Sequence, residues 1–171
     1  MREDELLALC NEFYSLGVDG MYLKKWRKGL PKDAVGNRAG NSHHSGYKYI
    51  KIAGKLYGEH RLVWLMVNGS FPDCDLDHED TNKSNNSIDN LRKSTRRQNM
   101  TNRNGWAKSG FKGVYPNKRG KPWNAKIRVN GEDINLGNFY VAEDAAKAYD
   151  VAAIKANGEF AKLNFDLENY K

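Results

Sequence analysis

The polar stretch from Asp77 to Asn99 constrains the fold of this chain more than any other feature. It opens with an adjacent acid and histidine, Asp77 and His78, and asparagines follow 12 and 21 residues after the histidine, at Asn90 and Asn99. Because few of its side chains are apolar, we expect a small unit organised around a cation rather than around a large core. An acid–histidine pair followed by asparagines in this order is typical of a metal-dependent hydrolytic site.

The segment that overlaps and follows this stretch is strongly basic. From Asn90 to Gly131, 42 residues include 12 Lys or Arg and no Asp or Glu, and the whole chain has a net charge of +7. Residues 57–104 carry 7 basic and 7 acidic side chains, whereas residues 105–171 carry 11 and 8. A basic surface favours a polyanionic partner, and a balanced middle segment is expected if its carboxylates serve a cation. Together these patterns indicate an enzyme that cuts nucleic acid.

Composition argues against several other classes of protein. The 171 residues suffice for one ordinary domain or two small ones. Cys10 and Cys74 lie far apart and form no CxxC, which argues against a disulfide framework or a cysteine zinc site. No apolar run approaches the length of a membrane span, and residues 1–5 lead into no signal-peptide core. We therefore expect a cytoplasmic protein with no membrane partner and no small-molecule cofactor.

Hydrophobic periodicity predicts the elements of the first half. Residues 5–16 are expected to form an amphipathic helix ended by Gly17, and residues 21–28 a strand. A loop over residues 36–46 leads to a strand at 47–52 that turns at residues 53–55. Residues 59–67 fit a short buried helix ended by Asn68-Gly69. Downstream, a strand at 74–77, a polar loop at 79–86, a return beginning at 90–91 and a helix at 94–99 predict a ββα arrangement.

The last third reads as a second unit after a polar linker at residues 100–109. Residues 111–115, 123–129 and 134–139 are expected to be strands, and Asn130-Gly131 predicts a hairpin because both residues tolerate positive φ. Residues 142–157 have an alanine-rich helical pattern ended by Gly158. The predicted fold class is α+β: a nuclease domain over residues 1–100, with a ββα core at about 72–100, then a three-stranded antiparallel sheet packed on one helix over residues 110–171.

Residue chemistry assigns roles within the Asp77–Asn99 stretch. Neutral His78 can accept a proton from water near neutral pH. Asp77 and Asn99 offer oxygen ligands that favour Mg²⁺ or Mn²⁺ over zinc, and Asn90 is expected to fix the loop through backbone hydrogen bonds. Adjacent residues of a strand point to opposite faces, so Asp77 and His78 share a site only if the strand ends or bends there.

Other polar clusters in the chain are weaker candidates. A calcium loop beginning at Asp73 fails because His78 and Ser84 stand where glycine and a bidentate glutamate are needed. His43 and His44 are expected to lie in a solvated loop. His60 is open to two interpretations, a contact to the phosphate backbone beside Arg61 or a structural polar contact.

The middle of the chain resembles the HNH, or ββα-metal, nuclease family, and in particular its phage and intron homing endonucleases. The resemblance spans about residues 20–100, and the matching stretches are 60–64, 76–80, 85–86, 90–92 and 98–99. It implies that His78 is the general base, that Asp77 and Asn99 bind the metal, and that Asn90 supports the loop. The third letter of the motif is Asn here, whereas many relatives have His, which weakens a transition-metal reading. The resemblance also implies a phage-encoded protein in a bacterial host cell.

Residues 109–165 resemble the ethylene-response-factor type of plant DNA-binding domain, which is also found fused to phage HNH nucleases. The matching stretches are 109–114, 123–128, 136–139, 142–150 and 158–165. The resemblance implies a sheet that lies in the DNA major groove. Lys126 and Arg128 share one strand face by period two, opposite an apolar face that should pack on the helix. Where plant relatives use Arg and Trp for bases, this chain has Tyr115, Asn117, Asp133 and Asn135, so the base preference does not carry over.

The expected DNA-binding residues fall into three groups. The first group is Arg61, in the predicted helix, with the basic residues around the linker, which are expected to contact the DNA backbone. The second group is the lysines and arginine near the first strands of the second unit, which are expected to contact phosphates. The third group lies on the sheet. Together the three groups comprise Arg61, Arg92, Arg96, Arg97, Arg103, Lys112, Tyr115, Asn117, Lys118, Arg119, Lys126, Arg128 and Asn135.

The sequence thus predicts a metal-dependent, site-directed endonuclease for double-stranded DNA. Two alternatives stay open: a DNA-binding transcriptional regulator with a vestigial nuclease domain, and a non-specific nuclease. We expect a monomer or weak dimer.

Overall fold

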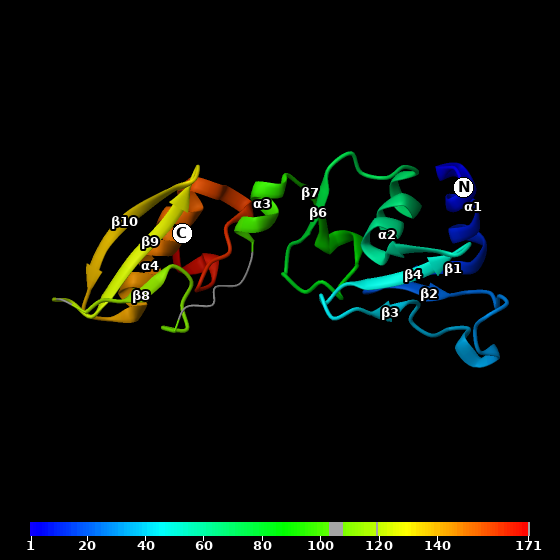
Figure 1. The fold of residues 1–171 in the computed structure, drawn as a ribbon, viewed down its shortest axis with the longest axis horizontal. Coiled ribbons are helices and arrows are strands. Elements are labelled where there is room, and N and C mark those ends of the chain that lie inside the picture. The colour runs from blue at the N-terminus through cyan, green and yellow to red at the C-terminus, as the bar shows by residue number, and fades with distance from the viewer. Residues whose placement is uncertain (103–107, 119, 171) are drawn as a thin grey trace. The chain divides into compact units, whose positions relative to one another are not determined.

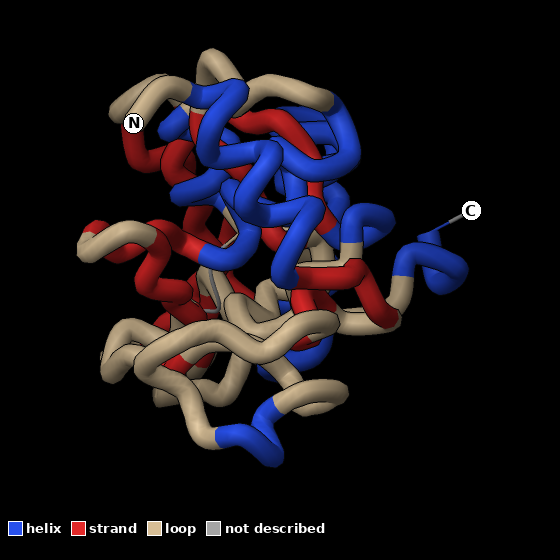
Figure 2. The backbone as a smooth tube through the Cα atoms, turned by 90° about the vertical axis from the view of Figure 1, so that its right-hand side faces the viewer, coloured by secondary structure: helices blue, strands red, loops and turns tan. Residues whose placement is uncertain are grey.

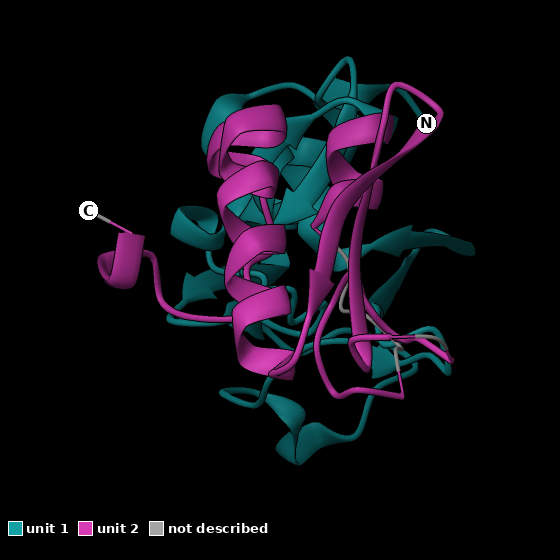
Figure 3. Ribbon diagram, turned by 90° about the vertical axis from the view of Figure 1, so that its left-hand side faces the viewer, with its two compact units in different colours: residues 1–96 teal, residues 97–171 magenta. Residues whose placement is uncertain are grey.

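The computed structural model describes residues 1–102, 108–118 and 120–170. These residues form four α-helices and several small antiparallel sheets, so the fold is of mixed α and β type, as the sequence predicts (Figure 1). Loops and turns, tan in Figure 2, connect the short elements. The chain divides into two compact units, Met1–Arg96 (unit 1) and Arg97–Lys171 (unit 2), which are coloured separately in Figure 3. Within the described residues, no helix has the length and apolar character needed to cross a membrane.

Unit 1 begins with α1 (Glu3–Phe13), followed by a hairpin of β1 (Tyr14–Gly17) and β2 (Gly20–Leu23). The predicted helix over residues 5–16 is therefore wrong at its end, and the predicted strand over 21–28 stops at Leu23. Tyr14 continues the helical spacing of Leu6 and Cys10, and all three side chains are buried. The spacing indicates only that these three side chains are buried on one side of the chain. A strand that directly follows the helix can also place Tyr14 on that side.

The centre of unit 1 is a small sheet followed at once by a helix. The strands β3 (Asn41–Ser42), β4 (Lys48–Ile52) and β5 (Lys55–Gly58) lie in the order β3-β4-β5. The β4–β5 turn uses positive φ at Ala53 and Gly54, which confirms the predicted turn. α2 (Glu59–Asn68) follows β5 directly and ends at Gly69, whose φ of 77° suits a helix C-terminus. The apolar face of α2 packs into the core of unit 1.

A second hairpin closes unit 1. Its strands are β6 (Asp75–His78) and β7 (Leu91–Ser94), joined by a polar loop that ends in a 3₁₀ turn, Ile88–Asn90. The next element is α3 (Arg96–Thr101), two residues later than the predicted helix at each end. The first residues of the predicted linker are thus helical, and residues 103–107 lie outside the described residues. Because the boundary between the units falls after Arg96, most of α3 belongs to unit 2.

Unit 2 contains one sheet and one long helix. The strands β8 (Val114–Pro116), β9 (Trp123–Val129) and β10 (Glu132–Phe139) are antiparallel in the order β10-β9-β8. α4 (Ala142–Asn157) packs its alanine face on β9, where Ala125 and Ile127 are buried. Both the predicted range of α4 and the predicted Asn130-Gly131 hairpin are confirmed, with φ values of 54° and 89° at the turn.

The end of unit 2 is fixed to α4 by a buried carboxylate. Short 3₁₀ turns at Gly158–Phe160 and Leu167–Tyr170 follow the helix. Asp150 is fully buried and accepts hydrogen bonds from the backbone of Asn164 and Phe165 and from the Tyr170 hydroxyl. Donors from residues 14, 15 and 20 positions further along the chain compensate the buried charge and position the segment after α4.

Candidate active site

Asp77 and His78 lie together at the end of β6, and each has an exposed fraction of only 4%. β6 ends at His78, and the next residue opens the polar loop. Both residues are still paired in the β6–β7 ladder, Asp77 with Arg92 and His78 with Leu91, and the strand ends directly after His78.

The Asp77 carboxylate is paired with the guanidinium of Arg92, which lies opposite it on β7. The Oδ2 atom of Asp77 accepts hydrogen bonds from Nε and Nη2 of Arg92 at 3.0 and 2.9 Å. Two charge-assisted hydrogen bonds to this one oxygen stabilise a carboxylate that has almost no access to water. Arg92, expected along the DNA backbone, is therefore held to Asp77 in this structure.

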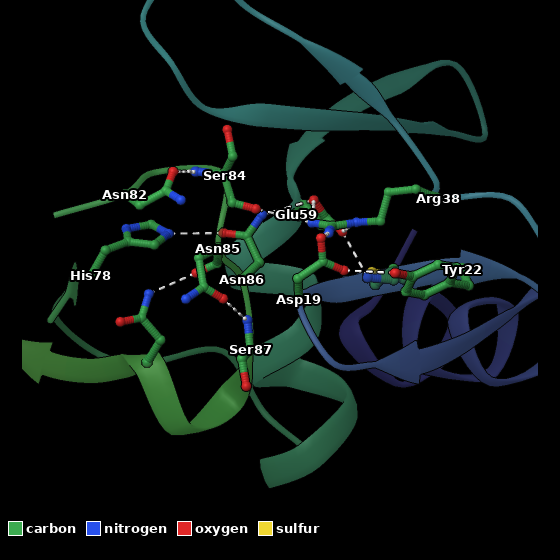
Figure 4. Close-up of polar contacts among 12 residues, drawn as sticks. Asp19, Tyr22, Arg38, Glu59, His78, Asn82, Ser84, Asn85, Asn86 and Ser87 are labelled. Atoms are coloured by element: carbon green, nitrogen blue, oxygen red, sulfur yellow. Dashed lines mark hydrogen bonds and ion pairs between the residues drawn. The ribbon is translucent and has the colours of Figure 1, made fainter. Parts of the chain in front are cut away.

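His78 is held by the side chain of Asn86. The Nε2 atom of His78 lies 2.8 Å from Oδ1 of Asn86, and Nδ2 of Asn86 donates to Oε2 of Glu59 at 2.7 Å. Asn86 and Glu59 are both fully buried. The chain of contacts from histidine to amide to carboxylate crosses the interior of unit 1 (Figure 4).

Glu59 is surrounded by donors from other parts of unit 1. Its carboxylate accepts the backbone N–H of Met21 at 2.7 Å and two guanidinium N–H groups of Arg38 at 3.1 and 3.0 Å. Arg38 also forms an ion pair with Asp19. Gly20 is needed where the chain passes this pair, because a Cβ there would lie 2.3 Å from Oε1 of Glu59.

The loop after His78 is folded around Asp80 and Asn90. Asn90 accepts the backbone N–H of Asp80 and donates to the Asp80 carboxylate, both at 3.0 Å, and to the carbonyl of Asn85 at 2.8 Å. Burial acts to raise the pKa of Asp80, but hydrogen bonds from Asn85, Asn82 and Asn90 outweigh it and the pKa is lowered. Asn90 thus makes the loop contacts that its sequence position suggested, through the side chain of Asp80 as well as through the backbone.

Aromatic rings cover one side of His78. The ring centroids of His60 and Tyr47 lie 5.6 and 5.9 Å from that of His78, and Lys83 stands over the Tyr47 ring. Burial, followed by the nearby charges of His78 and Arg61, lowers the pKa of His60 to about 4. His60 is therefore neutral at physiological pH, which favours the structural interpretation over a phosphate contact.

The remaining predicted residues of the nuclease part are spread over both units. Arg61 on α2 donates to the carbonyl of Pro72 and lies over the Phe71 ring. Asn99 lies on α3 in unit 2, as does Arg97, whereas Arg96 is the last residue of unit 1. Asp77, His78 and Asn90 all lie in unit 1, each with its own polar partners, whereas Asn99 belongs to unit 2.

The predicted DNA-binding residues of unit 2 concentrate on the face of the sheet opposite α4. Lys126 and Arg128 are exposed, alternating with the buried Ala125 and Ile127. A shallow hollow on this face is lined mainly by polar side chains, including Tyr115, Asn117, Asn124, Lys126, Asn135 and Asn138. Lys118 is exposed, and the predicted residues Arg103 and Arg119 lie outside the described residues.

Lys112 does not have the exposed position expected of a phosphate contact. Its ammonium group donates to the carbonyl of Thr101, and burial, together with the charge of Lys162, lowers its pKa to about 8. Its backbone N–H is also bound to Asn164. Lys112 thus joins segments within unit 2.

The sequence reasoning missed Glu59, Asn86, Arg38 and Asp19 as parts of the site. One local signal existed, because Glu59 is an acidic residue at the first position of a helix that is otherwise apolar on its inner face. Its partners are 38, 27 and 21 residues away along the chain, at Met21, Asn86 and Arg38. Contacts over such separations leave no periodic pattern in the sequence.

Comparisons with known proteins identify relatives of two kinds. Residues 57–101 match the family model described as HNH endonuclease. An uncharacterized HNH endonuclease, L560, of Acanthamoeba polyphaga mimivirus is 34% identical over 121 residues, 70% of this chain and 63% of that protein. The AP2-like ethylene-responsive transcription factor CRL5 of Oryza sativa subsp. japonica is 47% identical over 64 residues, 36% of this chain and 10% of that protein.

A third relative aligns with more of the chain. The AP2-like ethylene-responsive transcription factor ANT of Arabidopsis thaliana is 29% identical over 153 residues, 85% of this chain and 26% of that protein. The chain therefore spans less than two thirds of the length of each of these relatives.

Proposed function

We propose that this chain, which matches a family model described as HNH endonuclease over residues 57–101, is a metal-dependent endonuclease that hydrolyses phosphodiester bonds of double-stranded DNA at a chosen site, in the manner of the phage-type homing endonucleases. The observation that supports this most is the buried Asp77–His78 pair at the end of β6, in which each side chain is held by a polar partner. The match of residues 57–101 to the HNH endonuclease model covers the same pair.

In this proposal His78 is the general base. It accepts a proton from a water molecule, and the oxygen of that water attacks phosphorus while the bond to the 3′ oxygen breaks. Asn90 supports the reaction indirectly, because its contacts to Asp80 and Asn85 fix the loop that follows His78. The rings of His60 and Tyr47 lie against the imidazole of His78.

A divalent ion, Mg²⁺ or Mn²⁺, would be held by Asp77 and Asn99. Their carboxylate and amide oxygens are ligands that these ions prefer. When bound, the ion would stabilise the charge on the phosphate and on the leaving oxygen. Among the described residues, no three His, Cys, Asp or Glu side chains gather as a metal site.

Unit 2 would select the DNA site as a sheet of the ethylene-response-factor type. Exposed Lys126 and Arg128 alternate with buried residues on β9, and the same face bears Tyr115, Asn117 and Asn135. A strand that presents alternate side chains suits the major groove, where base edges are distinguishable. The AP2-like relatives support a DNA-binding role for part of the chain.

Those relatives also favour the main alternative, a DNA-binding regulator with an inactive nuclease domain. The Arg92 guanidinium on Asp77 supports the same alternative, because it occupies a carboxylate that the active enzyme needs for its ion. The two proposals differ in a single property, cleavage in the presence of metal.

This proposal is tested with DNA that spans the site at which the gene for this protein is inserted, in the form that lacks the insertion. The measurement is cleavage of that DNA. The full chain is incubated with that DNA and Mg²⁺, Mn²⁺ or EDTA, beside three variants. His78→Ala should abolish cleavage while DNA binding is nearly unchanged, and Asp77→Asn should abolish metal-dependent cleavage. Asp75→Asn, an exposed carboxylate on the same strand, is the matched control and should cut normally.

The products separate the possible functions. Discrete bands that require metal and His78 would support a site-directed endonuclease, and a denaturing gel would separate nicks from double-strand breaks. A smear would favour a non-specific nuclease. Binding without cleavage in any metal would favour the regulator.

A further inference from the structure

We infer that Glu59, acting through Asn86, is a positioning residue that holds His78 in the tautomer with hydrogen on Nε2, so that Nδ1 is the atom that accepts the proton from water. The inference rests on the proposed function for its catalytic meaning. Its structural part, the tautomer, stands on unit 1 alone.

The chemistry of the donors fixes the direction of each hydrogen bond. Glu59 receives N–H groups from Met21, Arg38 and Asn86, and an ionised carboxylate can only accept. The atom of Asn86 that faces Glu59 must therefore be its NH₂ group. The carbonyl oxygen of Asn86 then faces His78, and because an amide oxygen only accepts, Nε2 of His78 must carry the hydrogen.

The surroundings of Asn86 leave no other orientation. Its backbone N–H donates to the carbonyl of Asp19 at 2.8 Å. The main chain is therefore fixed beside the relay, by which we mean the hydrogen bonds from His78 through Asn86 to Glu59. Reversal of the amide would place NH₂ against the ring nitrogen and oxygen against the carboxylate. That arrangement removes one donor from a fully buried charge and sets two acceptors against each other.

Arg38 and Gly20 keep Glu59 in place. Arg38 contacts both carboxylate oxygens, donates to the carbonyl of Ser84 at 3.1 Å and pairs with Asp19. Gly20 has a φ of 146° and lets the chain pass within reach of the carboxylate, where any Cβ would collide with it. The β1–β2 hairpin, α2 and the polar loop thus meet at one ionised group.

This arrangement matters when His78 takes up a proton. The new N–H forms on Nδ1, and the imidazolium keeps its Nε2–H bond to Asn86. The negative charge of Glu59 polarises the Asn86 amide. The partial negative charge on the amide oxygen of Asn86 then faces the positively charged ring of His78. With the other tautomer, Nδ1 would already carry hydrogen and could not accept the proton of water.

The tautomer is measurable in the full chain without any substrate. Long-range ¹H–¹⁵N correlation spectra at pH 8 distinguish protonated from unprotonated ring nitrogens, and His78→Gln assigns the signals by their loss. Wild-type protein should show a protonated Nε2 and an unprotonated Nδ1. Two relay variants are compared with it, Glu59→Gln, which keeps the shape but sets an NH₂ group against donors, and Asn86→Leu, which removes the amide.

Both variants should shift the tautomer toward hydrogen on Nδ1 and should lower metal-dependent cleavage about 10–100-fold per folded molecule, the usual effect of losing an orienting partner. Ile52→Val, a buried apolar change in unit 1 away from the polar network, is the control for stability. It should leave both the tautomer and the rate per folded molecule unchanged. A merely structural role of Glu59 would lower the melting temperature without moving the tautomer.

The outcomes separate this inference from the proposed function. Wild-type protein that cuts DNA but holds hydrogen on Nδ1 would overturn the inference alone, even if no variant folds. An unchanged tautomer in both folded variants would overturn it as well. Wild-type protein with the expected tautomer that cuts no DNA in any metal would overturn the proposed function, and the catalytic role of Glu59 with it.

Discussion

His60 makes unit 1 sensitive to acid, and the size of the effect follows from its burial. Its pKa is lowered from 6.5 to about 4 in the folded chain. Between these values the unfolded chain binds a proton that the folded chain refuses, so stability falls as the pH drops from 6.5 to 4 and is unaffected by this group above that window. A shift of this size corresponds to about 3 kcal/mol in the free energy of unfolding.

The perturbation that isolates this effect is His60→Gln, which removes the titrating group. Carboxylates elsewhere also titrate in this range, so the quantity of interest is the difference in pH slope between wild type and variant. Urea unfolding at pH 8 and at pH 4.5 is followed by the methyl signals of Ile50 and Ile52, which are buried in unit 1. Between these pH values wild type should lose about 2.5 kcal/mol more than the variant.

The absolute stability of the variant is not informative, because the substitution also changes packing against Tyr47 and His78. A difference in slope below about 1 kcal/mol would refute the reasoning, since it would mean that His60 can be protonated in the folded chain. A difference of the opposite sign would show that the folded site stabilises the imidazolium.

Two further predictions concern unit 2. Gly113→Ala should destabilise it by about 1–3 kcal/mol more than Gly110→Ala in thermal unfolding, because both residues have positive φ but only a Cβ at 113 would collide with the Tyr149 ring; equal losses would show that the ring moves aside freely. Lys126→Ala should weaken DNA binding and lower the salt dependence of the binding constant by about one ion, whereas Lys147→Ala on the exposed side of α4 should change neither. Equal effects of both lysines on binding titrations would argue against the sheet face as the DNA surface.

Elements with strong local patterns were predictable. The range of α4 agrees with its alanine periodicity and its terminal Gly158, and the β9–β10 hairpin follows from Asn130-Gly131. α2 also ends at the glycine that the sequence indicates. In these places the residues that set the local backbone are the same ones that set the packing, so pattern and fold agree.

Elements whose ends depend on pairing were less predictable. Tyr14 fits the helix by spacing, yet it pairs with Leu23 in a strand, because burial is compatible with either backbone.

The candidate site also divides into a part that is predictable from the sequence and a part that is not. The order of Asp77, His78 and Asn90 and the type of chemistry they offer can be recognised from the sequence.

The residues that hold these groups were decided by the tertiary structure. Arg92 faces Asp77 because of the register of β6 and β7, and Glu59 reaches Asn86 because α2 and the polar loop meet in the core of unit 1. By itself the sequence determined the chemistry available, since it fixes which side chains can accept protons or bind cations. Only the tertiary structure decided which donor faces which acceptor, because burial excludes water and leaves each polar group to a partner that folding brings from far along the chain.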